Sequence, residues 1–252
     1  MISEKKDFKW VGTRQIRPDG HDKVTGRAKF GSDFSLSGMI HGRVLRSPHA
    51  HALINSIDTS KAEALPGVKA VITSKDFKDQ PSELKPAGEG MVNYRDMTRN
   101  VMAREKVLYD GHAVAAVAAT TVEIAEAALE LIDVNYEVLA HVIDVDDAMR
   151  DGAPILDDTM VPIGYETKGP TNIAKHVEFS LGDTAKGFEE AEVVIERSYK
   201  TEAVHQGYIE PHAVVASVSE DGQAQIWCCT QGQFMVRTFV GQLLGMPTSS
   251  IR

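Results

Sequence analysis

The run from His112 to Ala119 (HAVAAVAA) constrains the fold more than any other stretch of the chain. Its side chains are small and almost all apolar, which is typical of a strand buried on both faces. Thr120 and Glu123 follow with the T-x-x-E spacing of a capping box, which marks the start of a helix. One apolar face of that helix would hold Ile124, Ala128, Leu131 and Ile132. Because residues 133–138 (DVNYEV) are typical of another strand, the sequence predicts a strand–helix–strand unit over 112–138.

The chain ahead of this unit carries further strand patterns. Apolar and β-branched runs predict strands at 39–45, 52–57 and 68–73. We expect a short helix between the last two strands, with Thr59 or Ser60 as N-cap and Pro66-Gly67 as its stop. Residues 74–103 are polar, contain glycines and prolines, and show no clear periodicity. They predict a long loop, which in a compact domain is usually functional or packed against something else.

The second half of the chain begins with an acidic segment, 144–170, which contains Gly and Pro and is typical of a linker. Polar and apolar residues alternate over 173–181, Asp183 is expected to cap a short helix, and 193–204 predicts a long strand. Residues 213–218 and 223–229 flank Glu220-Asp221-Gly222 and predict a hairpin. A helix is expected next, and its apolar face would be Val236, Phe239, Val240, Leu243 and Leu244. Gly245 and Pro247 would end it, and the whole pattern is that of an α+β protein.

The bulk properties exclude several classes of function. A formal net charge of -9, with no basic run, argues against a nucleic-acid partner. No apolar stretch approaches the length of a membrane span, and the charged N-terminus has no signal-peptide pattern, so we expect a cytoplasmic protein. The only cysteines, Cys228 and Cys229, are neighbours in sequence. They lack the spacing of a disulfide or a metal site, and they cannot supply the four ligands of an iron–sulfur cluster.

Two groups of residues have the spacing of a site, but we favour a structural role for each. His49 and His51 would share one face of a strand and could reach one metal ion, but no third ligand is placed nearby. Tyr208, Glu210 and His212 also alternate to one face. A Glu–His pair could transfer a proton, although buried carboxylates are more often structural ion-pair partners than catalytic groups.

Gln231 is the strongest candidate for a functional side chain. It lies in the segment Thr230-Gln231-Gly232-Gln233-Phe234, between a predicted strand and a predicted helix. The amides of a helix N-terminus can donate to an anion or oxo group, and a Gln side chain adds both a donor and an acceptor. Two interpretations stay open from the residues alone: Gln231 contacts a ligand, or it helps to cap the helix.

Four segments, taken together, resemble the molybdopterin-binding large subunits of the xanthine dehydrogenase, aldehyde oxidase and carbon monoxide dehydrogenase family. The segments are DGHDKVTGRAKFGSDF (19–34), GRVLRSPHAHALINSIDTSKAEALPGVKAVIT (42–73), YDGHAVAAVAATTVEIAEAALELIDVNYEVL (109–139) and EPHAVVASVSEDGQAQIWCCTQGQFMVRTFVGQLLGMPTSSIR (210–252). Each alone is modest support, but their order and spacing make the assignment strong. The chain is similar to the front portion of such a subunit.

The resemblance implies a domain arrangement and a site. Residues 1–145 would form an α/β hammerhead domain with an extended N-terminal segment, 146–164 a linker, and 165–252 the incomplete first part of a molybdopterin-binding domain. Gln231 matches the family's glutamine that hydrogen-bonds an oxo ligand of molybdenum, and Gly232 beside it is a second cofactor-binding candidate. The family's glycine-rich loop and catalytic glutamate would lie beyond Arg252, so no catalytic residue and no metal ligand is assigned within the chain.

The implied function is that of a component of a molybdenum hydroxylase, which uses water as the oxygen source. The cofactor would be molybdenum–molybdopterin, in its cytosine dinucleotide form, with [2Fe–2S] clusters and FAD on partner subunits. The expected partners are these iron–sulfur and FAD subunits, the remainder of the molybdenum subunit and a small-molecule substrate. The chain alone is expected to be inactive. The alternative is a non-catalytic hammerhead module that docks the iron–sulfur and flavin subunits.

Overall fold

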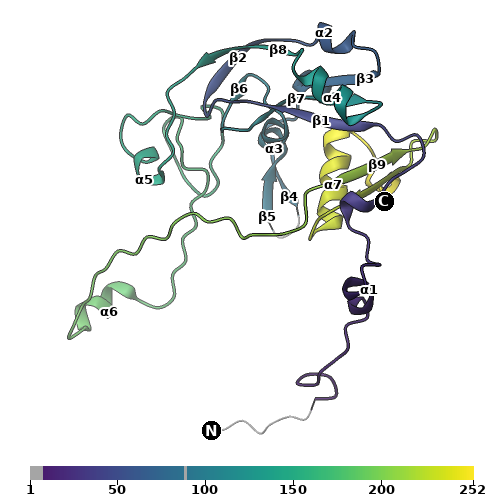
Figure 1. Ribbon diagram of the computed structural model, residues 1–252. Coiled ribbons are helices and arrows are strands. Elements are labelled where there is room, and N and C mark those ends of the chain that lie inside the picture. The colour runs from purple at the N-terminus through teal and green to yellow at the C-terminus, as the bar shows by residue number, and fades with distance from the viewer. Residues whose placement is uncertain (1–7, 88–89) are drawn as a thin grey trace. The chain divides into compact units, whose positions relative to one another are not determined.

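The computed structural model describes residues 8–87 and 90–252, so residues 1–7 of the predicted first domain lie outside the described part. It is a mixed helix and strand structure, as the α+β prediction requires (Figure 1). The chain divides into two compact units. The larger unit contains residues 38–205 and 232–251, and the smaller contains the described residues up to 37, residues 206–231 and Arg252. No helix in the described part is long and apolar enough to cross a membrane.

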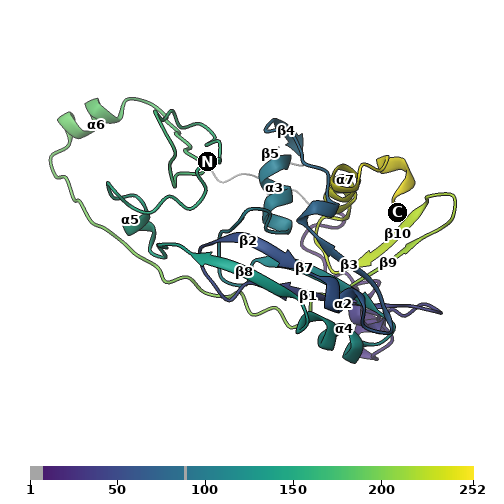
Figure 2. The same ribbon diagram turned by 90° about the horizontal axis from the view of Figure 1, so that it is seen from above.

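Two three-stranded sheets form the centre of the larger unit (Figure 2). The first has the order β1 (His41–Arg46), β7 (Ala113–Ala119), β3 (Val68–Thr73), and both outer strands run antiparallel to β7. The second has the order β6 (Lys106–Val107), β2 (Ala52–Asp58), β8 (Asp133–Val138). The strands predicted at 39–45, 52–57, 68–73, 112–119 and 133–138 are therefore confirmed, with small shifts at their ends.

Strand β7 is buried on both faces, as its sequence predicts. Ala115, Val117 and Ala119 enter one core cluster, while Val114 enters a second with Ala52, Ala103 and Val107. The first cluster is closed by the short helix α2 (Ser60–Glu63) through Ala62 and by α4 (Val122–Leu129) through Ala125 and Ala128. Ile132, in the turn before β8, also belongs to it. Small side chains dominate both clusters, so helix α4 approaches the sheet closely.

The strand–helix–strand prediction is confirmed except for the N-cap of its helix, and the structure adds how its strands pair. Strands β7 and β8, on either side of α4, belong to different sheets. The N-cap of α4 is Thr121 rather than Thr120, because Oγ1 of Thr121 accepts a hydrogen bond from the amide of Ile124 at 3.3 Å. The pKa of Glu123 is lowered because its carboxylate accepts hydrogen bonds from its own amide and from the Thr121 side chain.

The prediction of a long loop over 74–103 was also wrong. A 3₁₀ turn (Ser74–Asp76), strands β4 (Leu84–Ala87) and β5 (Gly90–Asn93), and helix α3 (Tyr94–Val101) form there, while residues 88 and 89 lie outside the described part. Asn93 caps α3 through Oδ1, which accepts from the amide of Arg95. Tyr94 packs edge-on against Phe239, a contact between residues far apart in sequence that no local pattern reveals.

Residues 140–205 have little regular structure. The segment contains helices α5 (Val145–Ala148) and α6 (Thr184–Glu190), and one isolated bridge joins Ile163 to Lys175. Asp183 caps α6 as predicted, through a 2.9 Å hydrogen bond from the amide of Lys186. The strand predicted over 193–204 is absent from this described segment. Its backbone has no neighbouring strand, and its apolar side chains stay exposed, with Tyr199 at 90%.

The smaller unit is built on the predicted hairpin. Strands β9 (Val214–Val218) and β10 (Ala224–Cys228) pair antiparallel, with Ala224 opposite Val218 and Cys228 opposite Val214. The unit also holds the short helix α1 (Gly20–Val24) and a 3₁₀ turn (Gly31–Asp33). Phe34 stacks on Trp227 of β10, with ring centroids 6.1 Å apart. This aromatic pair joins the N-terminal segment to the hairpin.

Candidate functional site

The candidate site begins where strand β10 ends. Hydrogen bonding to the partner strand continues one residue past Cys228, because the amide of Cys229 lies 3.5 Å from the carbonyl oxygen of Ala213. Gln231 follows two residues later and is exposed. The hairpin therefore fixes the backbone just before Gln231, while its side chain is accessible to a ligand.

Helix α7 (Gln233–Leu244) follows, and Gly232 is its N-cap. Gly232 has no side chain and makes no side-chain cap, so Gln231 does not occupy the capping position. The C-terminal end is as predicted: Gly245 adopts a left-handed conformation, and its amide bonds the carbonyl of Gly241. Of the two interpretations of Gln231, capping from the N-cap position is thus removed, and the ligand interpretation stays a prediction.

The donor chemistry at Gln231 and Gly232 fits an oxo or anionic group. Gln231 offers an exposed amide NH₂ donor, which is a group that can hydrogen-bond an oxo or anionic ligand. A Cβ built on Gly232 would meet Met235 at 3.7 Å, an ordinary contact, and its φ of -138° is open to any residue. The glycine is therefore required neither by strain nor by crowding within the protein.

The two cysteines beside this segment are free thiols of intermediate burial. Sγ of Cys229 lies 3.7 Å from the carbonyl oxygen of Ala213 and 3.9 Å from that of Pro211. Within the described ranges, no group of three or more His, Cys, Asp or Glu is placed to hold a metal ion.

The structure separates Glu210 from the neighbours that shared its predicted face. The Glu210 carboxylate accepts a 3.2 Å hydrogen bond from the amide of Gly31, so it holds the N-terminal segment of the smaller unit. Tyr208 and His212 pair with each other instead, with 2.9 Å between the phenol oxygen and Nδ1. This arrangement supports a structural role for Glu210.

His51 also has structural partners. It is 4% exposed, its Nδ1 lies 2.6 Å from the carbonyl oxygen of Ala140, and its Nε2 lies 3.1 Å from that of Leu156. Both ring nitrogens are therefore engaged by backbone carbonyls. His49 packs edge-on against Tyr136, with ring centroids 5.0 Å apart. His51, just before strand β2, thus contacts the segments that follow β8, whereas His49 contacts β8 itself.

Sequence reasoning missed a cavity of about 330 Å³ in the larger unit, which we call the Arg99 cavity. Its lining residues are Leu53, Arg99, Arg104, Glu105, Lys106, Leu108, Asp157, Asp158 and Thr159. Most of them lie in or beside the segment treated as a loop, and the others come from strand β2 and the predicted linker. Local sequence gives no signal for this cavity, because Arg99, Arg104 and Lys106 are interspersed with apolar residues and Glu105 and show no periodicity.

Two family models match most of the chain. The model of the α/β hammerhead domain of aldehyde oxidase and xanthine dehydrogenase matches residues 25–140, and that of the molybdopterin cofactor-binding domain matches residues 165–252. The finer boundaries expected from the sequence, a hammerhead to 145 and a linker over 146–164, stay predictions.

Comparison with known proteins gives the same family. The chain is 36% identical to a probable xanthine dehydrogenase subunit of Bacillus subtilis, over 94% of this chain and 29% of that protein. It is 34% identical to the carbon monoxide dehydrogenase large chain of Afipia carboxidovorans, over 96% of this chain and 30% of that protein. The crystal structure of quinoline 2-oxidoreductase from Pseudomonas putida matches with a TM-score of 0.77 and 29% identity, over 95% of this chain and 29% of that one.

The chain thus spans about 30% of the length of these relatives. The alignments cover nearly all of it, and the order of the two matched domains is the order expected from the sequence. The chain belongs to the xanthine dehydrogenase, aldehyde oxidase and carbon monoxide dehydrogenase family of molybdopterin-dependent oxidoreductase subunits, and it carries the family's hammerhead domain and part of its cofactor-binding domain.

Proposed function

We propose that the chain is a component of a cytoplasmic molybdenum hydroxylase and that it contributes Gln231 to the cofactor site. The observation that carries the proposal is the placement of Gln231, an exposed amide that follows the end of strand β10 in the smaller unit. Because this side chain is exposed and does not cap α7, it can donate to an oxo or anionic group without breaking a contact that stabilises the fold. Gly232 would let the group approach the backbone closely.

When bound, molybdenum–molybdopterin, here proposed in its cytosine dinucleotide form, supplies the oxidation chemistry that hydroxylates the substrate with water-derived oxygen. The residues of this chain bind and orient. The Gln231 NH₂ group would hydrogen-bond the ligand shell, and such outer contacts tune a metal site. The proposal places [2Fe–2S] clusters and FAD on partner subunits.

The exposed apolar residues of 177–204 support the proposal that further polypeptide covers this segment in the assembled enzyme. They are Val177, Phe179, Leu181, Phe188, Val193, Val194, Ile195, Tyr199 and Val204, each more than half exposed. Large apolar side chains that gather on a surface often mark an interaction site. The proposed cover is polypeptide corresponding to the rest of the relatives' large subunits, on the same chain or another, and the residues 193–204 would gain a strand partner there.

A second function is favoured by one specific observation. The two three-stranded sheets and their clusters form within residues 38–138 and bury their own cores. Such a body could dock the iron–sulfur and flavin subunits without any cofactor. In that case the chain would be an interaction module, and Gln231 would have no ligand.

Metal analysis separates the two functions. The chain would be purified alone and in a complex with the iron–sulfur subunit, the FAD subunit and the remaining molybdenum-subunit polypeptide. We expect molybdenum in the complex and none in the chain alone. An intact complex without molybdenum would contradict the hydroxylase proposal and favour the docking module. The substrate needs a separate screen, because purines, aldehydes, N-heteroaromatics, carbon monoxide and aromatic acyl-CoA thioesters all fit the proposed chemistry.

A further inference from the structure

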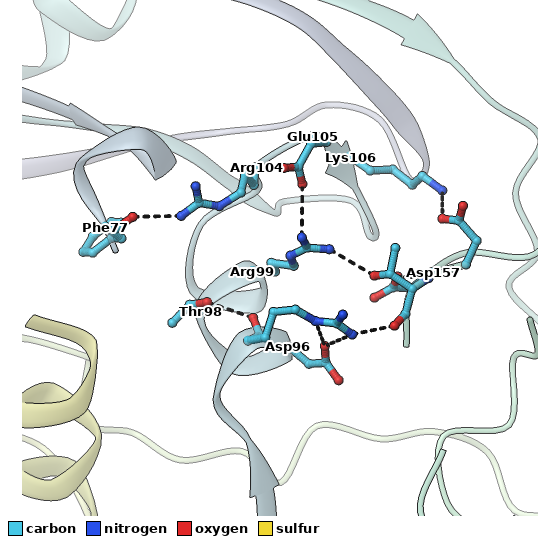
Figure 3. A network of polar contacts seen from close by, with 11 residues as sticks. Phe77, Asp96, Thr98, Arg99, Arg104, Glu105, Lys106 and Asp157 are labelled. Carbon is cyan, nitrogen blue, oxygen red and sulfur yellow. Dashed lines mark hydrogen bonds and ion pairs between the residues drawn. The ribbon is translucent and has the colours of Figure 1, made fainter. Parts of the chain in front are cut away.

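The Arg99 cavity is lined by both apolar and charged side chains, and Figure 3 shows Arg99 and Arg104 in the polar network at this place. Leu53 of strand β2 and Leu108, just after β6, supply apolar lining, and Arg99 of helix α3 and Arg104 supply cationic groups. The volume of about 330 Å³ lies at the lower end of the ~300–1,000 Å³ that small-molecule sites occupy. The space therefore suits a small molecule.

The carboxylates that line the cavity already have partners. Asp158 pairs with Lys106, with 2.8 Å between Oδ1 and Nζ. Asp157 accepts hydrogen bonds from both the amide and the hydroxyl of Thr159, at 2.9 and 2.7 Å. Glu105 is the loosest of the three, because its carboxylate lies 3.9 Å from Nη2 of Arg99. Lys106 is thus neutralised at close range, whereas the two arginines are not.

Both arginines retain donor capacity. Nε of Arg99 is buried and has no hydrogen-bond partner among the described residues, although its Nη1 donates to the Thr159 hydroxyl at 3.0 Å. Arg104 donates through Nη2 to the carbonyl oxygen of Phe77 at 2.9 Å, which is a neutral acceptor. No ion pair of Arg104 occurs within the described part of the chain. A guanidinium has five N–H donors in a planar fork that matches a carboxylate. These two side chains can therefore donate hydrogen bonds to a bound carboxylate.

We propose that the Arg99 cavity binds a small organic carboxylate. Its carboxylate would lie against Arg104 and Arg99, and its apolar part would lie against Leu53 and Leu108. This assignment is independent of the molybdenum proposal, because it uses neither Gln231 nor Gly232. A carboxylate carried by a partner protein could use the same donors, and the test below distinguishes that source.

The test uses three probes of one shape on the full 252-residue chain: benzoate, its neutral amide benzamide and the cation benzylamine. Binding would be followed by titration calorimetry and by methyl NMR shifts of Leu53 and Leu108. We expect saturable benzoate binding below about 10 mM, and benzamide at least about tenfold weaker. Equal binding of benzoate and benzamide, preference for benzylamine, or no benzoate binding would each overturn the proposal.

Variants tie the binding to Arg104. We expect Arg104→Gln to weaken benzoate binding at least about tenfold, because the charged fork is lost. Lys85→Gln, which removes a cation of strand β4 that does not line the cavity, should change benzoate binding less than about twofold. Arg104→Lys keeps the charge and should still lose affinity, so it serves if Arg104→Gln fails to fold. Unchanged benzoate affinity in a folded Arg104 variant would refute the assignment. A different pair of results would assign the cavity to a carboxylate of a partner protein. In that case the parent chain would not bind benzoate, and the Arg104 variants would lose binding to the iron–sulfur subunit.

Discussion

Nε2 of His112 lies 2.9 Å from the carbonyl oxygen of Arg99. The imidazole is completely buried, and its Nδ1 accepts a 3.2 Å hydrogen bond from the amide of Leu108. One nitrogen therefore accepts and the other must donate, which fixes the neutral Nε2–H tautomer. Burial lowers the pKa of His112, against the opposing effect of hydrogen bonds to the carbonyls of Arg99 and Asn100. His112 thus joins β7 to helix α3 as an uncharged group.

This arrangement predicts a pH dependence of stability. Because the folded pKa of His112 is below its ordinary value of 6.5, the unfolded chain takes up a proton first as the pH falls. The stabilising contribution is complete above about pH 7 and is lost as the pH falls from there toward the folded pKa. The free energy of unfolding, measured by urea titration from pH 8 to 5, should fall less steeply in His112→Gln than in the parent chain.

The matched control is His21→Gln, which removes an exposed imidazole in helix α1. It should keep the slope of the parent chain. A parent chain and a His112→Gln variant with the same slope would show that His112 does not carry the pH dependence.

The position of the α4 N-cap gives a second prediction. Thr121→Val should lower the free energy of unfolding by about 1 kcal/mol, because the amide of Ile124 loses its side-chain acceptor. Thr120→Val changes an exposed neighbour and should stay within about 0.5 kcal/mol of the parent. Thermal and urea unfolding of both variants would measure this. A larger loss for Thr120→Val would return the cap to the position that the T-x-x-E spacing indicates.

A third prediction concerns the close packing of α4 on the sheet. Ala125 is completely buried in the cluster with Ala115 and Val117, so Ala125→Leu should overpack it and cost about 1–3 kcal/mol. Ala127→Leu places the same side chain on the exposed face of the same helix, where a change within about 0.5 kcal/mol is expected. Similar unfolding midpoints for the two variants would mean that the interface has room for larger side chains.

The elements that could be predicted from the sequence are those whose contacts join residues close together in the chain. The strand 112–119, the hairpin around Glu220-Asp221-Gly222 and the Gly245 stop were all predicted, because each depends on residues within a few positions of one another. Helix α3 was missed because its contact with Phe239 is distant in sequence. The strand over 193–204 was predicted from β-branched residues alone, but a strand also needs a partner.

The candidate site follows the same rule. The position of Gln231 between a strand and a helix could be predicted from local pattern, and the structure has those elements. Its ligand could be named only through the family resemblance and stays a proposal. The Arg99 cavity could not be predicted, because the contacts of Arg99 with Thr159 and of Lys106 with Asp158 join residues far apart in sequence.

The central claim, that this chain contributes Gln231 to a molybdenum site, is tested most directly by turnover of the reconstituted complex per bound molybdenum. Because Gln231 is exposed and is not the cap of α7, Gln231→Ala should leave the free energy of unfolding within about 0.5 kcal/mol of the parent. Turnover should fall by about tenfold to a hundredfold, as it does when other outer contacts of a metal are removed. Gln233→Ala, an exposed glutamine at the first position of α7, is the matched control and should keep parental turnover. Unchanged turnover in a stable Gln231→Ala complex, or an equal loss in Gln233→Ala, would contradict the claim.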